Sequence, residues 1–402
     1  MPWRTTGVLE ERLKFVLAYV AGEGSVAELA RTHGISRKTA YKFLSRFPLE
    51  GVAGLQDRSR APHAHPNAIT PGVVELLLQA RRRHPTWGAR KLLPYLARRY
   101  PGLVLPAAST VSRLLRVQGL AARRARRRPL GGSAAPGRGT APNDLWSADF
   151  KGWFRAGNGE RCEPLTITDH ASRFGLACDV LERGTLPTVR PVFERIFREY
   201  GLPGALRTDN GLPFASTGLG GLTRLSAWWI RLGIRPERIA PGQPQQNGRH
   251  ERFHRTLQEA TARPPSPTRR AQQRASDAFL REYNYERPHA ALGDRPPADV
   301  YVPSARPYPT HLAPLAYPPD CEVRRVQSCG HMKWRGQDVF VSQALVGQHV
   351  GLRQTADDQW RLYFGPVELA RFDARQRKVL PLATPLWTDP EPIADQEVSP
   401  MS

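Results

Sequence analysis

Residues 145–154 read LWSADFKGWF, residues 206–214 read LRTDNGLPF, and residues 243–257 read QPQQNGRHERFHRTL. Each stretch contains one acidic residue: Asp149, Asp209 and Glu251. The first stretch is typical of a strand, the second of a short strand that ends in an Asp-Asn-Gly turn, and the third of a helix. Taken singly, Asp209 fits a turn former and Glu251 fits a surface helix residue. Together the three carboxylates have the chemistry needed to hold divalent metal ions against a phosphodiester.

The sequence around these acids alternates between strand and helix patterns. Three strands, a helix, a strand, a helix, a strand and a helix are predicted at residues 143–154, 163–172, 175–182, 187–201, 204–211, 222–233, 234–240 and 244–260. This is the element order of an RNase H-like α/β fold, with an antiparallel meander first. Asp149 would lie on the first strand, Asp209 at the end of the fourth, and Glu251 on the last helix.

Charge is unevenly distributed along the 402 residues. Lys and Arg number 59 against 36 Asp and Glu, which gives a formal charge of +23. Residues 1–142 contain 25 of the basic and 7 of the acidic residues, so this third carries +18. Basic clustering of this kind favours a nucleic-acid partner over a merely solvated surface. No apolar run approaches membrane-span length and the first fifteen residues do not resemble a signal peptide, so we expect no membrane contact and a cytoplasmic protein.

Two all-helical units are predicted before the α/β region. Residues 1–50 show three short helices with a His33-Gly34 turn, which is typical of a helix-turn-helix domain. Ser36 is the expected N-cap of the third helix, whose free side chains would contact DNA through Arg37, Lys38, Thr39, Tyr41 and Lys42. A packing module without DNA contact is the alternative. The pattern of residues 66–120 predicts a second helix-turn-helix unit, with or without a wing. Ser109 and Arg113 on its third helix are expected to contact DNA.

An arginine-rich segment follows at residues 121–141, where five arginines stand within six positions before a Gly/Pro/Ala run. Such a composition cannot form a core, and it predicts a flexible linker. We expect phosphate contacts from Arg123, Arg124, Arg126, Arg127 and Arg128. A linker that only adds solubility is the alternative.

The chain resembles the DDE transposases of bacterial insertion sequences, whose core is similar to the retroviral integrase catalytic domain. The resemblance covers residues 142–305. Its motifs are Trp146 and Asp149, the Thr208–Gly211 turn, Gln246 to Gly248 with Glu251, and Tyr283, Asn284, Arg287, Pro288 and His289. The chain departs from retroviral integrases in lacking a His/His/Cys/Cys finger at its start. The 41 residues between Asp209 and Glu251 also exceed the retroviral spacing, and the Gly-rich segment 215–229 is expected to absorb the excess.

The resemblance implies a catalytic and metal-binding trio of Asp149, Asp209 and Glu251. Two Mg²⁺ or Mn²⁺ ions per site are implied, with Asp149 shared between them. The implied partners are double-stranded DNA, as element ends and target, and further copies of the chain assembled on that DNA. Asn247 and Arg249 are expected to contact DNA, and His250 and His254 to lie on the helix surface or contact phosphate. The main hypothesis is a transposase that cleaves and joins DNA; the alternative is a catalytically silent, transposase-derived DNA-binding regulator.

The C-terminal part predicts a third kind of structure. Short alternating strands with tight turns at residues 320–382 favour a small β-barrel, which would bind DNA, mediate assembly or serve only as a structural module. Residues 383–402 are acidic and proline-containing, and we expect a disordered tail. The complete prediction is a multidomain chain with two helical readers, an RNase H-like core and a β-barrel.

Overall fold

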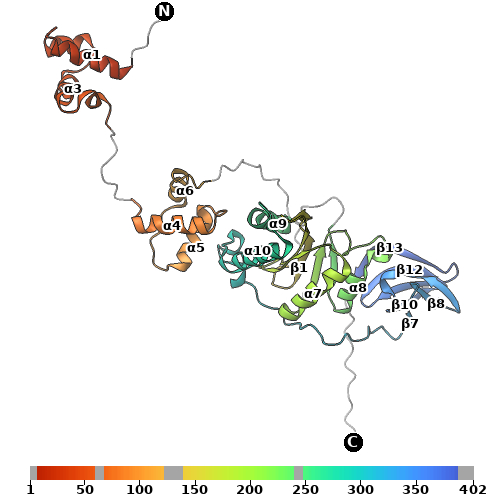
Figure 1. Cartoon of the computed structure of the whole chain (residues 1–402). Helices are drawn as coiled ribbons and strands as arrows, with labels where there is room; N and C mark the ends of the chain where they lie inside the picture. Colours follow the sequence, from red (N-terminus) through yellow and green to blue (C-terminus); the bar gives the residue numbers. More distant parts are fainter. Residues whose placement is uncertain (1–6, 59–67, 122–138, 240–247, 388–402) are drawn as a thin grey trace, which may run out of the picture. The chain divides into compact units, whose positions relative to one another are not determined.

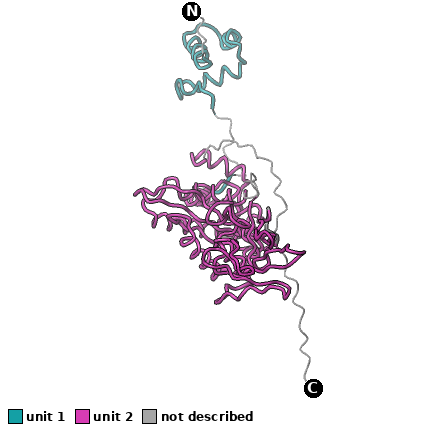
Figure 2. Tube along the Cα trace, turned by 90° about the vertical axis from the view of Figure 1, so that its right-hand side faces the viewer, with its two compact units in different colours: residues 1–70 teal, residues 71–402 magenta. Residues whose placement is uncertain are grey.

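The computed structural model describes residues 7–58, 68–121, 139–239 and 248–387 (Figure 1). The chain divides into two compact units, Met1–Thr70 and Pro71–Ser402 (Figure 2). Within the described residues, no helix is both long and apolar enough to span a membrane.

The first unit contains three helices, as the sequence predicted. They are α1 (Val8–Val20), α2 (Val26–Thr32) and α3 (Arg37–Glu50), followed by a short 3-10 helix at Gly51–Leu55. Gly34 provides the turn between α2 and α3 with a φ of 62°, a backbone conformation that glycine adopts without strain. Phe15, Val16, Ala40 and Phe43 form the core. Leu55 is buried in the same cluster, so the folded unit extends past the predicted boundary at residue 50.

The second helical part begins the larger unit and also has the three predicted helices. These are α4 (Pro71–Arg83), α5 (Ala89–Arg99) and α6 (Ala108–Val117). Leu77, Trp87, Leu92 and Val111 are completely buried. Residues 68–121 contain no strand, so the described part of this domain has no wing.

The central sheet has the strand order expected of an RNase H-like fold. β1 (Leu145–Phe150), β3 (Arg161–Asp169) and β4 (Gly175–Leu181) pair antiparallel, whereas β5 (Ala205–Thr208) and β6 (Arg235–Arg238) continue parallel to β1. A two-residue strand, β2 (Phe154–Arg155), extends the β3 side and was not predicted separately. The order across the sheet is therefore β4-β3-β1-β5-β6, with β2 also on β3.

Helices cover the two faces of this sheet. Leu165 and Ile167 of β3 belong to a core cluster formed with α7 (Leu186–Tyr200) and α8 (Arg224–Arg231), whereas the intervening Thr166 and Thr168 bond to α9 (Gly248–Thr261). Successive side chains of a strand point to opposite faces, so α9 lies on the face opposite α7 and α8. The second face also carries α10 (Arg269–Arg281), a helix that the sequence reading did not assign.

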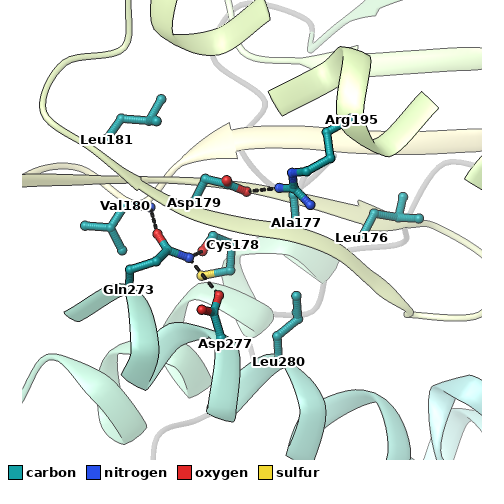
Figure 3. A pocket seen from close by; sticks show the side chains of 10 residues that line it. All are labelled: Leu176, Ala177, Cys178, Asp179, Val180, Leu181, Arg195, Gln273, Asp277 and Leu280. Atoms are coloured by element: carbon teal, nitrogen blue, oxygen red, sulfur yellow. Dashed lines mark hydrogen bonds and ion pairs between the residues drawn. The ribbon is translucent and has the colours of Figure 1, made fainter. Parts of the chain in front are cut away.

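Two side-chain amides bond to the outer edge of β4. Gln273 of α10 accepts from the Val180 amide at 2.6 Å and donates to the Cys178 carbonyl at 3.1 Å (Figure 3). Asn284, in a π-helical turn at Glu282–Glu286, bonds both backbone groups of Gly175 in the same way, at 2.8 and 2.9 Å. A shallow pocket of about 350 Å³ lies beside this edge.

The C-terminal part is β-rich, but the predicted barrel is not confirmed. Its sheet runs β13-β12-β11-β10-β7, and a separate hairpin pairs β8 with β9; the described strands do not close. Their bounds are Cys321–Arg325, His331–Trp334, Gln337–Phe340, His349–Ala356, Gln359–Phe364, Val367–Asp373 and Lys378–Trp387 for β7 to β13. The expectation of disorder from residue 383 was wrong as far as Trp387, because the end of β13 pairs with the start of β12, with Trp387 opposite Val367.

Candidate active site

Asp149 occupies the face of the sheet that α9 covers. In the β1–β3 ladder Asp149 lies opposite Thr166, and paired residues of neighbouring strands share a face. Ala148 and Trp146 of the same strand point to the other face, where both are fully buried. The Asp149 side chain remains 19% exposed, which leaves it open to a ligand.

Asp209 directly follows β5, the parallel neighbour of β1. The Gly211 amide donates to its carboxylate at 3.2 Å, which closes the predicted Asp-Asn-Gly turn. Asn210 donates to the Ile239 carbonyl at 2.9 Å and thereby fixes the turn to the chain that follows β6. The carboxylate is therefore held at the same end of the sheet as Asp149.

Glu251 lies in the first turn of α9 and is exposed. In the same turn Arg249 donates to the His170 carbonyl at 3.1 Å, so the helix start is anchored to the loop after β3. Asn247, which was predicted to contact DNA, lies outside the described residues.

Burial and nearby charges both act on the Asp149 carboxyl. Together they raise its pKa to about 7: burial is the largest cause and the charges of Asp209 and Glu251 add to it, against the lowering effects of the Phe150 amide and Lys151. Carboxylate oxygens are the ligands that Mg²⁺ and Mn²⁺ prefer, and a cation here would relieve the repulsion, so the residues present fit the implied metal.

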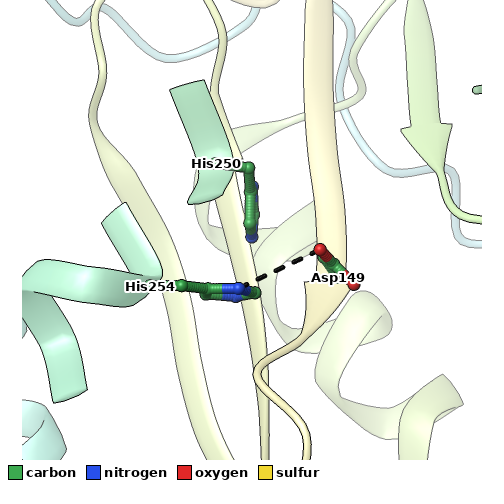
Figure 4. Close-up of side chains that lie close together, drawn as sticks. All are labelled: Asp149, His250 and His254. Carbon is green, nitrogen blue, oxygen red and sulfur yellow. Dashed lines mark ion pairs between the residues drawn. The ribbon is translucent and has the colours of Figure 1, made fainter. Parts of the chain in front are cut away.

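Two histidines of α9 are buried beside Asp149 (Figure 4). The sequence predicted that they lie on the helix surface or contact phosphate. That prediction was wrong, because His250 is 1% exposed and His254 is 7% exposed. Both Nε2 atoms lie within hydrogen-bond distance of the Thr166 hydroxyl, at 2.6 and 2.7 Å. His250 Nδ1 contacts the Thr168 hydroxyl at 3.1 Å, and His254 Nδ1 lies 4.0 Å from Asp149 Oδ2. Burial lowers the pKa of both rings, to about 3 for His250 and about 2 for His254.

The role of Thr166 and Thr168 was not predicted from the sequence, because it depends on which face of β3 they occupy and not on a sequence motif. In the strand sequence LTIT, the alternation buries Leu165 and Ile167 on one side and places two hydroxyls on the other. The helical spacing of four residues between His250 and His254 places both rings on one side of α9. Read together, the two patterns could have predicted the buried histidines.

Family models match three parts of the chain, residues 11–115, 139–297 and 321–380. Residues 139–244 and 232–297 match an integrase core domain, residues 11–63 a helix-turn-helix domain, residues 39–115 a homeodomain-like domain, and residues 321–380 the C-terminal domain of IS481 family transposases.

Two curated relatives are insertion-element proteins. A 31.7 kDa protein of insertion element IS407 from Burkholderia multivorans is 32% identical over 214 residues, covering 52% of this chain and 72% of that protein. The chain belongs to the integrase-core transposases of insertion elements. A 39.2 kDa protein of insertion element IS476 from Xanthomonas euvesicatoria is 28% identical over 319 residues, covering 74% of the transposase and 88% of that protein.

Solved integrases are among the structural neighbours of the transposase. The catalytic core domain of HTLV-2 integrase in complex with magnesium aligns with 41% of the transposase and 100% of that chain, at 16% identity and a TM-score of 0.33. An intasome of simian T-cell lymphotropic virus aligns with 78% of the transposase and 99% of that chain, at 16% identity and a TM-score of 0.36.

The predicted DNA-contacting side chains of the transposase fall into two groups. In α3, Ser36 caps the helix by accepting from the Thr39 amide, as predicted. Six of the predicted contact residues on α3 and α6 are exposed: Arg37, Lys38, Tyr41, Lys42, Ser109 and Arg113. Thr39 is half-buried. The linker arginines, Arg123, Arg124, Arg126, Arg127 and Arg128, lie outside the described residues.

Proposed function

We propose that this transposase binds the terminal inverted repeats of an insertion sequence and catalyses metal-dependent DNA strand cleavage and strand transfer. The observation that carries the proposal is that Asp149 on β1 and Asp209 directly after the neighbouring strand β5 lie at the same end of the sheet, while Glu251 lies in the first turn of α9, the helix whose His254 contacts Thr166 opposite Asp149. These acids come from a strand, a strand end and a helix that are far apart in the sequence. Three carboxylates at one site would make a site for divalent cations.

In this proposal Asp149, Asp209 and Glu251 would hold two Mg²⁺ or Mn²⁺ ions. Bound ions would activate the attacking oxygen and stabilise the leaving oxygen of an in-line displacement. The protein residues bind and orient the DNA end, and none serves as a covalent nucleophile. Water attacks first and frees a 3′-hydroxyl, and that hydroxyl then attacks the target strand.

The helical domains supply DNA recognition in this proposal. The exposed cations of α3 suit the major groove, and phosphate contacts from the basic N-terminal third add salt-sensitive affinity. The second helical domain lengthens the recognised site through effective concentration. Joining two element ends to a target needs more than one active site, so we expect several copies to assemble on DNA in the bacterial cytoplasm.

The test is a nicking and joining assay with labelled terminal-repeat DNA and the full chain. We expect Mg²⁺-dependent cleavage by the wild type, and at least a 100-fold loss in Asp209→Asn and Glu251→Gln. Glu259→Gln is the matched control, because Glu259 is an exposed glutamate two turns further along α9. Repeat binding without nicking in the wild type would identify a DNA-binding regulator and overturn the enzymatic proposal.

A further inference from the structure

The hydrogen-bond network around Thr166 determines where the protons lie. Its four contacts join the Thr166 hydroxyl to the Asp149 carbonyl, to His250 Nε2 and to His254 Nε2, and the Thr168 hydroxyl to His250 Nδ1. Each threonine contributes one proton, and each neutral imidazole contributes one. The carbonyl can only accept, so the single Thr166 proton goes to Asp149.

One assignment gives each of these contacts a proton. Because the Thr166 hydroxyl has donated its proton, both histidines must donate to it from Nε2. His250 Nδ1 is then unprotonated and accepts from Thr168. Both ring nitrogens of His250 are thus used, whereas His254 keeps a bare Nδ1.

That bare Nδ1 faces a second acceptor. It lies 4.0 Å from Asp149 Oδ2, which is beyond hydrogen-bond distance, and the His254 side chain is only 8% exposed. Two bonds from a cation, each of about 2.1 Å, span up to about 4.2 Å, so a single cation can contact both atoms. A histidine that ligates a metal commonly donates its other ring nitrogen to a fixed acceptor, and here Thr166 has that role.

We propose that His254 Nδ1 is a nitrogen ligand of a divalent cation held by Asp149, in addition to the three carboxylates. The inference rests on the proposed function for the presence of that cation. An imidazole ligand favours borderline cations such as Mn²⁺ over Mg²⁺, which prefers an all-oxygen shell. The site is therefore selective for Mn²⁺ beyond what three carboxylates would give.

His250 is the internal control for this inference. It is on the same helix, is equally buried and bonds to the same hydroxyl, but its second nitrogen is occupied by Thr168. It positions α9 against β3 and does not ligate the metal. Replacing each histidine by glutamine in a separate variant distinguishes the positioning role from the metal-ligand role. The glutamine amide nitrogen reaches about as far as Nε2, but glutamine has no nitrogen at the Nδ1 position.

The experiment uses the full chain loaded with Mn²⁺ and compares the wild type, His254→Gln and His250→Gln. Pulsed EPR detects the ¹⁴N coupling of an imidazole bound to Mn²⁺, and a titration gives the Mn²⁺ and Mg²⁺ dissociation constants. We expect ¹⁴N coupling in the wild type and in His250→Gln and its loss in His254→Gln. We expect His254→Gln to weaken Mn²⁺ binding at least tenfold, with a smaller effect on Mg²⁺. Thermal unfolding of each variant checks that the site is intact.

Bound Mn²⁺ without ¹⁴N coupling in the wild type would overturn the inference, as would equal Mn²⁺ affinity in the wild type and His254→Gln. Either result leaves the proposed function standing if the wild type still nicks DNA. Conversely, ¹⁴N coupling in a protein that never nicks terminal-repeat DNA would support the His254 ligand and contradict the enzymatic proposal. If His254→Gln unfolds, His254→Asn replaces it: its amide oxygen can occupy the Nδ1 position, and we expect loss of the imidazole ¹⁴N coupling with partial Mn²⁺ binding.

Discussion

The amide groups that bond to the edge of β4 offer a sharp test of how this core is stabilised. An edge strand presents unpaired backbone groups, and here Asn284 and Gln273 take the place of a neighbouring strand. Asn284 is 4% exposed, whereas Gln273 is half-buried beside the shallow pocket of Figure 3. The same chemistry therefore occurs at two degrees of burial.

Truncation of each amide to alanine should have unequal effects. Asn284→Ala leaves the buried N–H and C=O of Gly175 without their side-chain partner, and each such loss costs about 1–3 kcal/mol. We expect the free energy of unfolding to fall by about 3 kcal/mol. Gln273→Ala exposes its backbone partners to water, so we expect a loss of about 1 kcal/mol.

Hydrogen exchange of a peptide that covers β4, together with thermal unfolding of the full chain, measures both effects. A loss of about 3 kcal/mol corresponds to roughly a hundredfold drop in protection, against about fivefold for Gln273→Ala. Equal losses in the two variants would refute the reasoning, because burial would then not determine the cost.

Three further predictions follow from single contacts. Ser36→Ala removes the N-cap of α3 and should lower the stability of the first unit by about 1 kcal/mol in denaturant unfolding, whereas Ser45→Ala should not. The pKa of Asp149 is raised to about 7, so its charged form is disfavoured in the folded protein. Asp149→Asn should therefore stabilise the metal-free protein by up to about 4 kcal/mol at pH 8, and this stabilisation should vanish below about pH 4, where the carboxyl is protonated in both states. A stabilisation independent of pH would contradict this. Lys42→Ala should weaken repeat binding and reduce the slope of log K against log salt by about one; an unchanged slope would show that Lys42 contacts no phosphate.

Periodicity and turn chemistry predicted most of the fold. The helix-turn-helix depends on local signals, namely the Ser36 cap and the Gly34 turn, and both are present. The strand and helix order of the core was predicted because each element has a strong period of its own. The three acids could be placed on their elements for the same reason.

The parts that were missed depend on contacts between distant segments. The burial of His250 and His254 requires β3 to present two hydroxyls to α9, 82 to 88 residues away along the chain. The predicted barrel would require the edge strands β7 and β13 to pair with each other, and no local sequence pattern indicates whether two distant strands pair. The strand at Lys378–Trp387 was missed because its apolar residues do not alternate with polar ones and it contains two prolines, so its pairing with β12 has no local signal.

The helix that carries Glu251 has packing contacts and hydrogen bonds of its own. Phe253 and Leu257 pack α9 into a cluster with Phe279 and Tyr283, and the two histidines bond it to β3. The Gly-rich segment 215–229 was expected to absorb the extra length between Asp209 and Glu251, and Leu219 and Leu222 within it are buried in the core of the C-terminal sheet. Two independent sets of contacts therefore fix the helix and the insertion. Changes in the C-terminal sheet should consequently affect the insertion before they reach the carboxylates.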